Sequence, residues 1–96
     1  MNETLALYQQ SGPTTFADLL TQLAPYFSTI SPEFLSLERG RCEVKVRNNP
    51  AVHNHLGTVH AIAMCNMAEL AAGTMVGAPL PANMRWIPKG MQVSYL

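Results

Sequence analysis

Residues 53–73, HNHLGTVHAIAMCNMAELAAG, contain most of the longest apolar segment of the chain, which extends from Val59 to Val76. The segment predicts a helix over about residues 58–76, roughly 30 Å long at about 1.5 Å per residue. Pro79 prevents the helix from continuing much further. Because this helix is apolar on nearly all of its faces, we expect a sheet to wrap around it.

The part of the chain before this segment predicts two shorter helices. Apolar side chains recur at helical spacing over residues 14–23, and Thr14 or Thr15 is expected to cap that helix. A shorter helix is expected from residue 3 to residue 10. Together they predict an N-terminal helical segment, residues 1–26.

Two other segments alternate between apolar and polar side chains, which is typical of strands with one buried face. The first covers residues 34–48, with Leu35 on its apolar side, and a tight turn or a bulge is expected at residues 38–41. The second covers residues 91–96. The sequence therefore predicts an α+β domain over residues 27–96. Since so few strands cannot wrap so long a helix, this domain is expected to be incomplete at its C-terminus.

The composition indicates a single small domain that buries apolar surface against a partner. The chain has 96 residues, of which 48% are hydrophobic and 12% are charged, whereas soluble domains carry about 25% charged residues. The net charge is zero, and three of the six basic residues share a predicted strand with Glu43. This pattern is typical of a solvated sheet face and argues against nucleic-acid binding.

The two cysteines and the N-terminal residues indicate in which cellular compartment the protein is expected. Cys42 and Cys65 do not form a disulfide framework in a chain that lacks a secretion signal, so both are expected to be reduced and buried. The N-terminal residues have neither a basic start nor a long apolar core. Polar groups within the apolar segment argue against a membrane span. We therefore expect a cytoplasmic protein that does not enter a membrane.

The residues at the start of the predicted long helix resemble a motif of the hotdog-fold acyl-CoA thioesterases, closest to their phenylacetyl-CoA thioesterase-like branch. The resemblance lies in residues 54–61, with Glu69 eight positions after Ala61. Residues 85–91, RWIPKGM, are similar to a poorly characterised subgroup of the same superfamily. The sequence departs from the family at His60-Ala61-Ile62, where the family has His-Gly-Gly.

The resemblance implies a hotdog fold, in which an antiparallel sheet wraps a long central helix, over roughly residues 27–96. It also implies an acyl-CoA substrate, no cofactor, and a dimer or tetramer. The backbone N–H of Ala61 would polarise the thioester carbonyl. Glu69 would act as general base or nucleophile, and Asn54, from the neighbouring subunit, would orient the reactants. The alternatives are a glutamate paired across an interface and an asparagine that serves only its own turn.

Five other residues are candidates for substrate binding. Gly57 lies in the motif, and Asn66, about 60° from Glu69 on a regular helix, could satisfy its carboxylate. His60 lies about 180° from Glu69, so it is expected to hold the helix start by a hydrogen bond rather than to act with that carboxylate. Arg85 and Lys89 could meet the phosphates of coenzyme A, although ordinary surface charge is the simpler interpretation.

Other chemistries are weakly supported. His53 and His55 form only a His-x-His pair without further ligands at familiar spacing, so no metal site is expected. The only aspartate is Asp18, which argues against the hydratases of the hotdog superfamily. A non-catalytic hotdog module, which binds acyl groups or assembles subunits, remains the alternative to a thioesterase.

Overall fold

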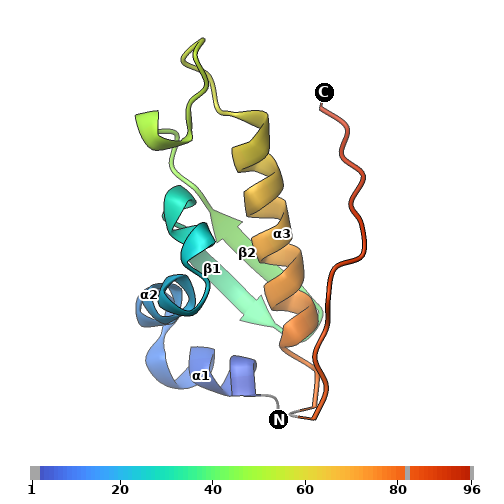
Figure 1. Cartoon of the computed structure of the whole chain (residues 1–96). Helices are drawn as coiled ribbons and strands as arrows, with labels where there is room; N and C mark the ends of the chain where they lie inside the picture. The colour runs from blue at the N-terminus through green and yellow to red at the C-terminus, as the bar shows by residue number, and fades with distance from the viewer. Residues whose placement is uncertain (1–2, 82, 96) are drawn as a thin grey trace.

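A computed structural model describes residues 3–81 and 83–95 of the chain and shows a mixed α+β fold (Figure 1). Within these residues, three α-helices and a β-hairpin form the framework, with two short 3-10 helices in the connections. No helix in these residues is both long and apolar enough to span a membrane. In chain order the elements are α1 (Glu3–Ser11), α2 (Pro13–Leu23), η1 (Pro25–Ile30), β1 (Glu33–Glu38), β2 (Arg41–Lys45), η2 (Pro50–Val52) and α3 (Ala61–Gly77).

The N-terminal helices form close to the predicted positions, but the expected cap of the second helix is wrong. α2 begins at Pro13, and Gly12 rather than Thr14 or Thr15 is its N-cap residue. Proline suits the first position of a helix because the N–H that it lacks would have no partner there. The Phe16 side chain is buried and meets the ring of Phe34 edge-on, with 5.0 Å between centroids.

The strand predicted over residues 34–48 is an antiparallel hairpin of β1 and β2, and the expected turn lies between them. The expected inward position of Leu35 is wrong. The pairing shifts between Phe34 and Ser36, so Leu35 lies in a bulge and is 59% exposed. An extra residue in one strand changes which side chains face the core, so Phe34 is buried in place of Leu35, while Leu37 is buried as its position in the alternating pattern predicts.

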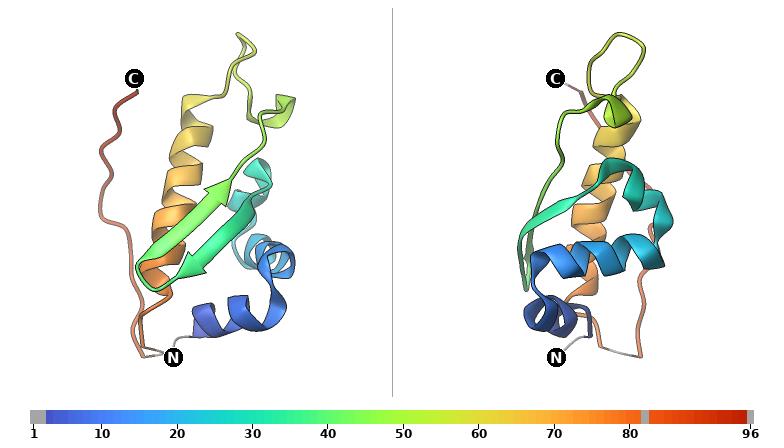
Figure 2. Two further views of the ribbon diagram at one scale, coloured as in Figure 1. Left: turned by 180° about the vertical axis from the view of Figure 1, so that it is seen from behind. Right: turned by 90° about the vertical axis from the view of Figure 1, so that its left-hand side faces the viewer.

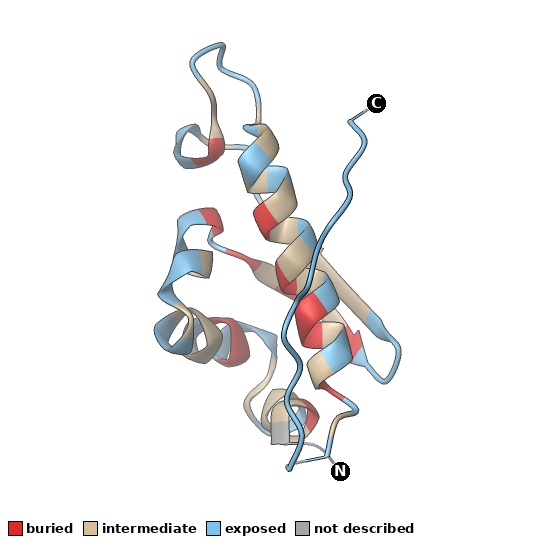
Figure 3. Cartoon of the chain, turned by 45° about the vertical axis from the view of Figure 1, so that its right-hand side comes forward, coloured by how far each residue is buried: buried red, intermediate tan, exposed pale blue. Residues whose placement is uncertain are grey.

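The long helix, α3, has 17 residues and starts at Ala61 rather than near Thr58. It starts later because residues 53–59 form a small projecting hairpin, in which His53 and Val59 pair as an isolated bridge. One side of α3 packs on β2 and η1, and Leu70 on that side is almost fully buried. The opposite side keeps exposed bands along its length (Figure 3).

The second predicted strand is not formed. Residues 83–95 are extended and run back along α3, from its C-terminal end to its start (Figure 2), and Leu96 lies outside the described residues. A strand needs a hydrogen-bonded neighbour, and residues 91–95 have no backbone partner within the described parts of the chain. The Tyr95 hydroxyl instead donates to the carbonyl oxygen of Ala61 at 3.2 Å and lies 3.0 Å from the Cys65 sulfur.

Both cysteines are free thiols, but they are half-buried rather than fully buried. Burial, and secondarily the carboxylate of Glu43, raises the pKa of the Cys42 thiol. Since only the thiolate is nucleophilic, Cys42 should react with iodoacetamide at neutral pH several-fold more slowly than an exposed thiol such as that of glutathione. Glu43→Gln should bring the alkylation rate of Cys42 closer to that of glutathione, and unfolding the protein in urea should make the two rates equal. Mass spectrometry of the alkylated peptide gives the rate, and a rate equal to that of glutathione would contradict the assignment.

Candidate functional site

The start of α3 is capped by His60, as the sequence predicted for this residue. The His60 Nδ1 atom accepts a hydrogen bond from the Ile62 N–H at 3.0 Å, and the His60 N–H donates to the Val52 oxygen at 2.7 Å. Because Nδ1 accepts, the neutral ring carries its proton on Nε2. The Ala61 N–H has no hydrogen-bond partner among the described residues, so it is available at the positive end of the helix.

Asn54 builds the turn at the tip of the projecting hairpin. Its Oδ1 atom accepts from the N–H groups of Leu56 (2.9 Å) and Thr58 (3.2 Å), and its Nδ2 donates to the Thr58 hydroxyl at 2.9 Å. Gly57 closes the turn with φ of 81°, a left-handed conformation that other residues adopt at a cost. In the single chain, the Asn54 carboxamide is thus used by its own turn.

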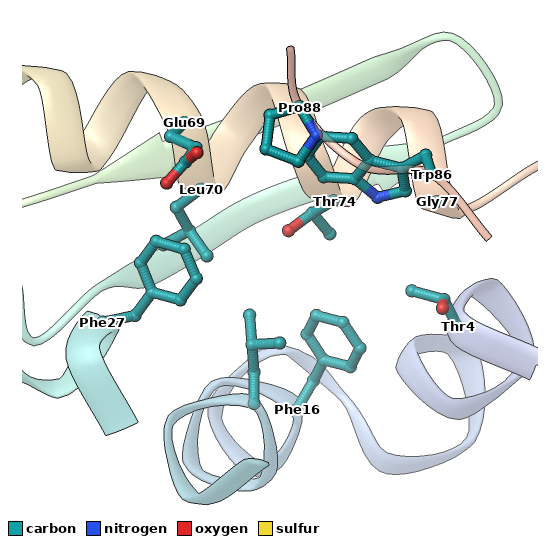
Figure 4. A pocket seen from close by; sticks show the side chains of 11 residues that line it. Thr4, Phe16, Phe27, Glu69, Leu70, Thr74, Gly77, Trp86 and Pro88 are labelled. Carbon is teal, nitrogen blue, oxygen red and sulfur yellow. The ribbon is translucent and has the colours of Figure 1, made fainter. Parts of the chain in front are cut away.

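A cavity of about 360 Å³, here called the larger cavity, lies between α3, α2, η1 and the extended segment (Figure 4). Glu69 lines it from α3 and is half-buried. The carboxylate has no ion-pair or hydrogen-bond partner within residues 3–81 and 83–95. The apolar lining consists mainly of Phe16, Leu20, Phe27, Leu70, Trp86 and Pro88.

A second cavity, of about 290 Å³, lies beside the start of α3 and is lined by His53, His60 and Asn66 among others. Asn66 is 6% exposed, and its Oδ1 atom is buried without a hydrogen-bond partner. The expected pairing of Asn66 with Glu69 is absent from the described residues. The two side chains line different cavities, because the 60° between them is enough to place Asn66 on the inner side of α3.

Asn66→Leu should stabilise the fold, since it removes a buried polar atom that has lost its water without gaining a partner. The free energy of unfolding should rise by about 1 kcal/mol. Urea unfolding followed by circular dichroism measures the change. Asn83→Leu, at an exposed position, is the control and should have little effect. Destabilisation by Asn66→Leu would show that a tightly held water or ligand satisfies the carboxamide.

Arg85 and Lys89 are exposed and flank the part of the extended segment that lines the larger cavity. The ion pairs between described side chains join Arg41 to Glu43 and Arg47 to Glu33, so neither Arg85 nor Lys89 is neutralised by a described carboxylate. Their charges are therefore available to an anionic ligand at the rim of the cavity.

No three histidine, cysteine, aspartate or glutamate side chains in the described residues come together as a metal site. His53, one of the two histidines considered for such a site, has its Nε2 atom against the Asn48 side-chain oxygen. His55 is exposed at the hairpin.

Trp86 is a site residue that the sequence analysis did not identify. It lies next to the candidate Arg85 in the sequence, and it forms a wall of the larger cavity. The feature of the sequence that could have identified Trp86 is a pair of glycines on α3. Gly73 and Gly77, four residues apart, leave one side of α3 without side chains, and the indole of Trp86 lies against them.

Comparisons with known proteins place the chain among relatives. A family model described as DUF4442, a domain of unknown function, matches residues 12–96. No curated protein matches the chain. A solved structure described as the crystal structure of genomics APC5556 is similar, with 53% sequence identity and a TM-score of 0.82. The similarity covers 98% of this chain and 64% of that one, so the chain spans less than two thirds of the length of its solved relative.

Proposed function

The chain belongs to the DUF4442 family, and from this premise we propose that it is a hotdog-fold acyl-CoA thioesterase whose site is shared between two copies. One observation carries the proposal, namely the unpaired Glu69 carboxylate in an otherwise largely apolar cavity. Such a cavity suits an acyl group whose thioester carbon lies beside a general base. α3 would be the central helix of the hotdog fold, with β1 and β2 as the first part of the sheet around it.

The spacing of Ala61 and Glu69 supports a site made by two chains. They are eight residues apart on one helix, which separates them by about 12 Å along the axis and about 80° around it. The N–H of Ala61 and the carboxylate of Glu69 in one copy therefore cannot both meet one thioester. Two antiparallel copies of α3 can bring the start of one helix to Glu69 of the other, in a dimer or tetramer.

The exposed apolar surface supports this association. Met64 and Val76, both on α3, are each 40% exposed, and Leu56 at the projecting hairpin is 74% exposed. Exposed large apolar side chains on a helix and on the hairpin before it are available to pack against a second copy. Gel filtration with light scattering should therefore give at least the mass of a dimer.

In the proposed reaction, the Ala61 N–H donates a hydrogen bond to the thioester carbonyl oxygen and stabilises the oxyanion that develops there. Glu69 takes a proton from a water molecule, whose oxygen attacks the carbonyl carbon. The tetrahedral intermediate collapses as the carbon–sulfur bond breaks, and the proton held by Glu69 passes to the departing thiolate. The products are a carboxylic acid and coenzyme A.

The remaining candidates would bind or position the substrate. Arg85 and Lys89 would attract the phosphates of coenzyme A to the rim of the cavity. Asn54 and Gly57 would act through the turn they build, which presents the hairpin to the neighbouring copy. His60 would fix the start of α3 and with it the direction of the Ala61 N–H. Asn66 lines the second cavity rather than the larger one, so it would contact only a part of the substrate that extends into that second cavity.

Release of free thiol from a panel of acyl-CoAs tests the proposal. The purified chain should release coenzyme A from at least one acyl-CoA at a rate proportional to protein concentration. Absence of release from acetyl-, octanoyl-, phenylacetyl- and palmitoyl-CoA would contradict it.

Two observations favour a second function, a module that binds acyl groups without hydrolysing them. The Asn54 carboxamide is used within its own turn, so it offers little to a substrate, and Ala61 stands where the hotdog thioesterases that the motif resembles have glycine. Calorimetry separates the two functions, because tight binding of acyl-CoA without thiol release fits only the module.

A further inference from the structure

We propose that Trp86, seated on Gly73, forms the wall that sets the size of the acyl group bound in the larger cavity, and that this group is of medium length. The identity of the ligand as an acyl-CoA rests on the proposed function. The role of Trp86 as the wall of an apolar binding cavity rests on the geometry alone.

The indole of Trp86 lies against α3 where that helix has no side chain. A Cβ atom added to Gly73 would be 2.4 Å from Cζ2 and 2.8 Å from Cη2 of the indole, and one added to Gly77 would be 3.7 Å from Nε1. The first two distances are too short for any side chain, so the indole occupies this place only because residue 73 is glycine.

The opposite wall comes from elements that are distant in the sequence. Phe16 of α2 and Phe27 of η1 line the cavity across from Trp86, and Leu70 of α3 lies beside Phe27 (Figure 4). Trp86 is 37% exposed, so the indole has one part on the cavity and another in solvent. It is therefore the only aromatic wall, of the three described, that can move outward without disturbing the buried core.

The segment that carries Trp86 has few other attachments. Its hydrogen bonds to the rest of the described chain lie near its ends, from the Met84 N–H to the Pro81 oxygen and from the Tyr95 hydroxyl to the Ala61 oxygen. Between them, residues 85–91 make no hydrogen bond within the described chain. The contact of Trp86 with Gly73 therefore positions this segment, and with it Arg85 and Lys89.

The charges and the volume indicate the occupant. An apolar cavity with two unpaired cations on its rim fits an amphiphile with an apolar tail and an anionic head, as an acyl-CoA has. A volume of about 360 Å³ lies at the small end of ligand cavities, which span roughly 300–1,000 Å³. An octanoyl chain therefore fits, an acetyl group leaves most of the cavity empty, and a palmitoyl chain must extend beyond Trp86.

Trp86 is the only tryptophan of the chain, so its fluorescence reports directly on this wall. The probe is a non-hydrolysable octanoyl thioether of coenzyme A. Titration should shift the emission to shorter wavelength with saturation, because the ligand removes water from the indole. Each methylene buried should tighten binding by about fourfold, so the acetyl thioether should bind far more weakly.

Gly73→Ala tests the wall itself. Alanine favours a helix more than glycine does, so weaker ligand binding by this variant cannot be attributed to destabilisation of α3. The variant should show red-shifted emission without ligand and bind the octanoyl thioether at least about tenfold more weakly. Ile87→Ala is the matched control, since Ile87 is adjacent, 84% exposed and outside the cavity lining. Unchanged emission and affinity in Gly73→Ala would overturn the proposal.

Trp86→Ala provides a second test if Gly73→Ala does not fold. Opening the wall should raise the affinity for the palmitoyl thioether relative to the octanoyl one several-fold, as measured by calorimetry, and an unchanged ratio would overturn the proposal. The same measurements distinguish failure of the thioesterase proposal from failure of the proposal about the Trp86 wall. If no acyl-CoA is hydrolysed but the octanoyl thioether still shifts Trp86 emission, the thioesterase proposal is wrong and the role of Trp86 stands. If Gly73→Ala and Trp86→Ala both hydrolyse acyl-CoAs with the chain-length preference of the wild type, and this hydrolysis depends on Glu69, the role of Trp86 is wrong and the thioesterase proposal stands.

Discussion

Glu69→Gln is expected to lower kcat for octanoyl-CoA by at least about a hundredfold, the usual contribution of a general base. The amide has the shape of the carboxyl group but cannot take a proton from water. Because Glu69 has no partner within the described residues, no ion pair is broken and the fold should be retained. KM should change little, since the acyl chain contacts the apolar walls rather than the carboxylate. Steady-state thiol release measures both constants.

Asp18→Asn is the matched control for this experiment. Asp18 is an exposed carboxylate on α2, outside the larger cavity, so its neutralisation should leave kcat and KM unchanged. Both variants should show the far-ultraviolet circular dichroism and melting temperature of the wild type. A Glu69→Gln protein that turns over at the wild-type rate would remove Glu69 from the mechanism.

Ala61→Pro is expected to lower kcat by about a hundredfold to a thousandfold, as the loss of an oxyanion-hole donor does. Ala61 is the first residue of α3, where proline is well tolerated because its missing N–H would have no helical partner. His60 before it is already extended, with ψ of 137°, as a residue before proline prefers. The substitution therefore removes one N–H group and little else, and thiol release again measures the effect.

Ala61→Gly is the control for Ala61→Pro, because glycine keeps the N–H and the start of the helix. It should retain wild-type turnover or exceed it if the alanine methyl crowds the thioester. Equal turnover in Ala61→Pro and Ala61→Gly would show that this N–H does not contact the carbonyl oxygen.

The long helix could be predicted from the sequence, but its first residue could not. The long apolar segment between His60 and Pro79 predicts a helix, and α3 forms there, although only one of its sides is buried within the described chain. Its start depended on Asn54, whose side chain holds Thr58 in a turn. Asparagine makes such turns in many contexts, and only the hydrogen bonds show that residues 58 and 59 belong to the hairpin.

The strand predictions were wrong at residues 91–95 and at Leu35, where the outcome depends on a neighbouring strand. An alternating pattern shows which side chains could share a face, not whether a neighbouring strand exists. Residues 91–95 have the pattern but no described partner, and they lie along α3 instead. Leu35 is exposed because one bulge shifted the register, and a bulge leaves no clear mark in so short a strand.

The candidate site was predicted only in those parts that lie on one element. Glu69 became a candidate through the resemblance of its motif to the hotdog thioesterases, and His60 was expected to hold the helix start, where the structure places it. The larger cavity could not be predicted, because Phe16, Phe27 and Trp86 come from three segments whose packing is set by tertiary contacts. The separation of Asn66 from Glu69 was likewise invisible, since their spacing permits a shared side of α3.

Mixing two inactive variants tests the shared site most directly. Glu69→Gln and Ala61→Pro proteins, unfolded together and refolded, should recover up to about a quarter of wild-type thiol release, since about half of the dimers are mixed and each mixed dimer has one intact site. Each variant refolded alone should stay inactive. Absence of recovery, with mixed dimers verified by mass spectrometry, would contradict a site built from the Ala61 N–H of one copy and Glu69 of the other.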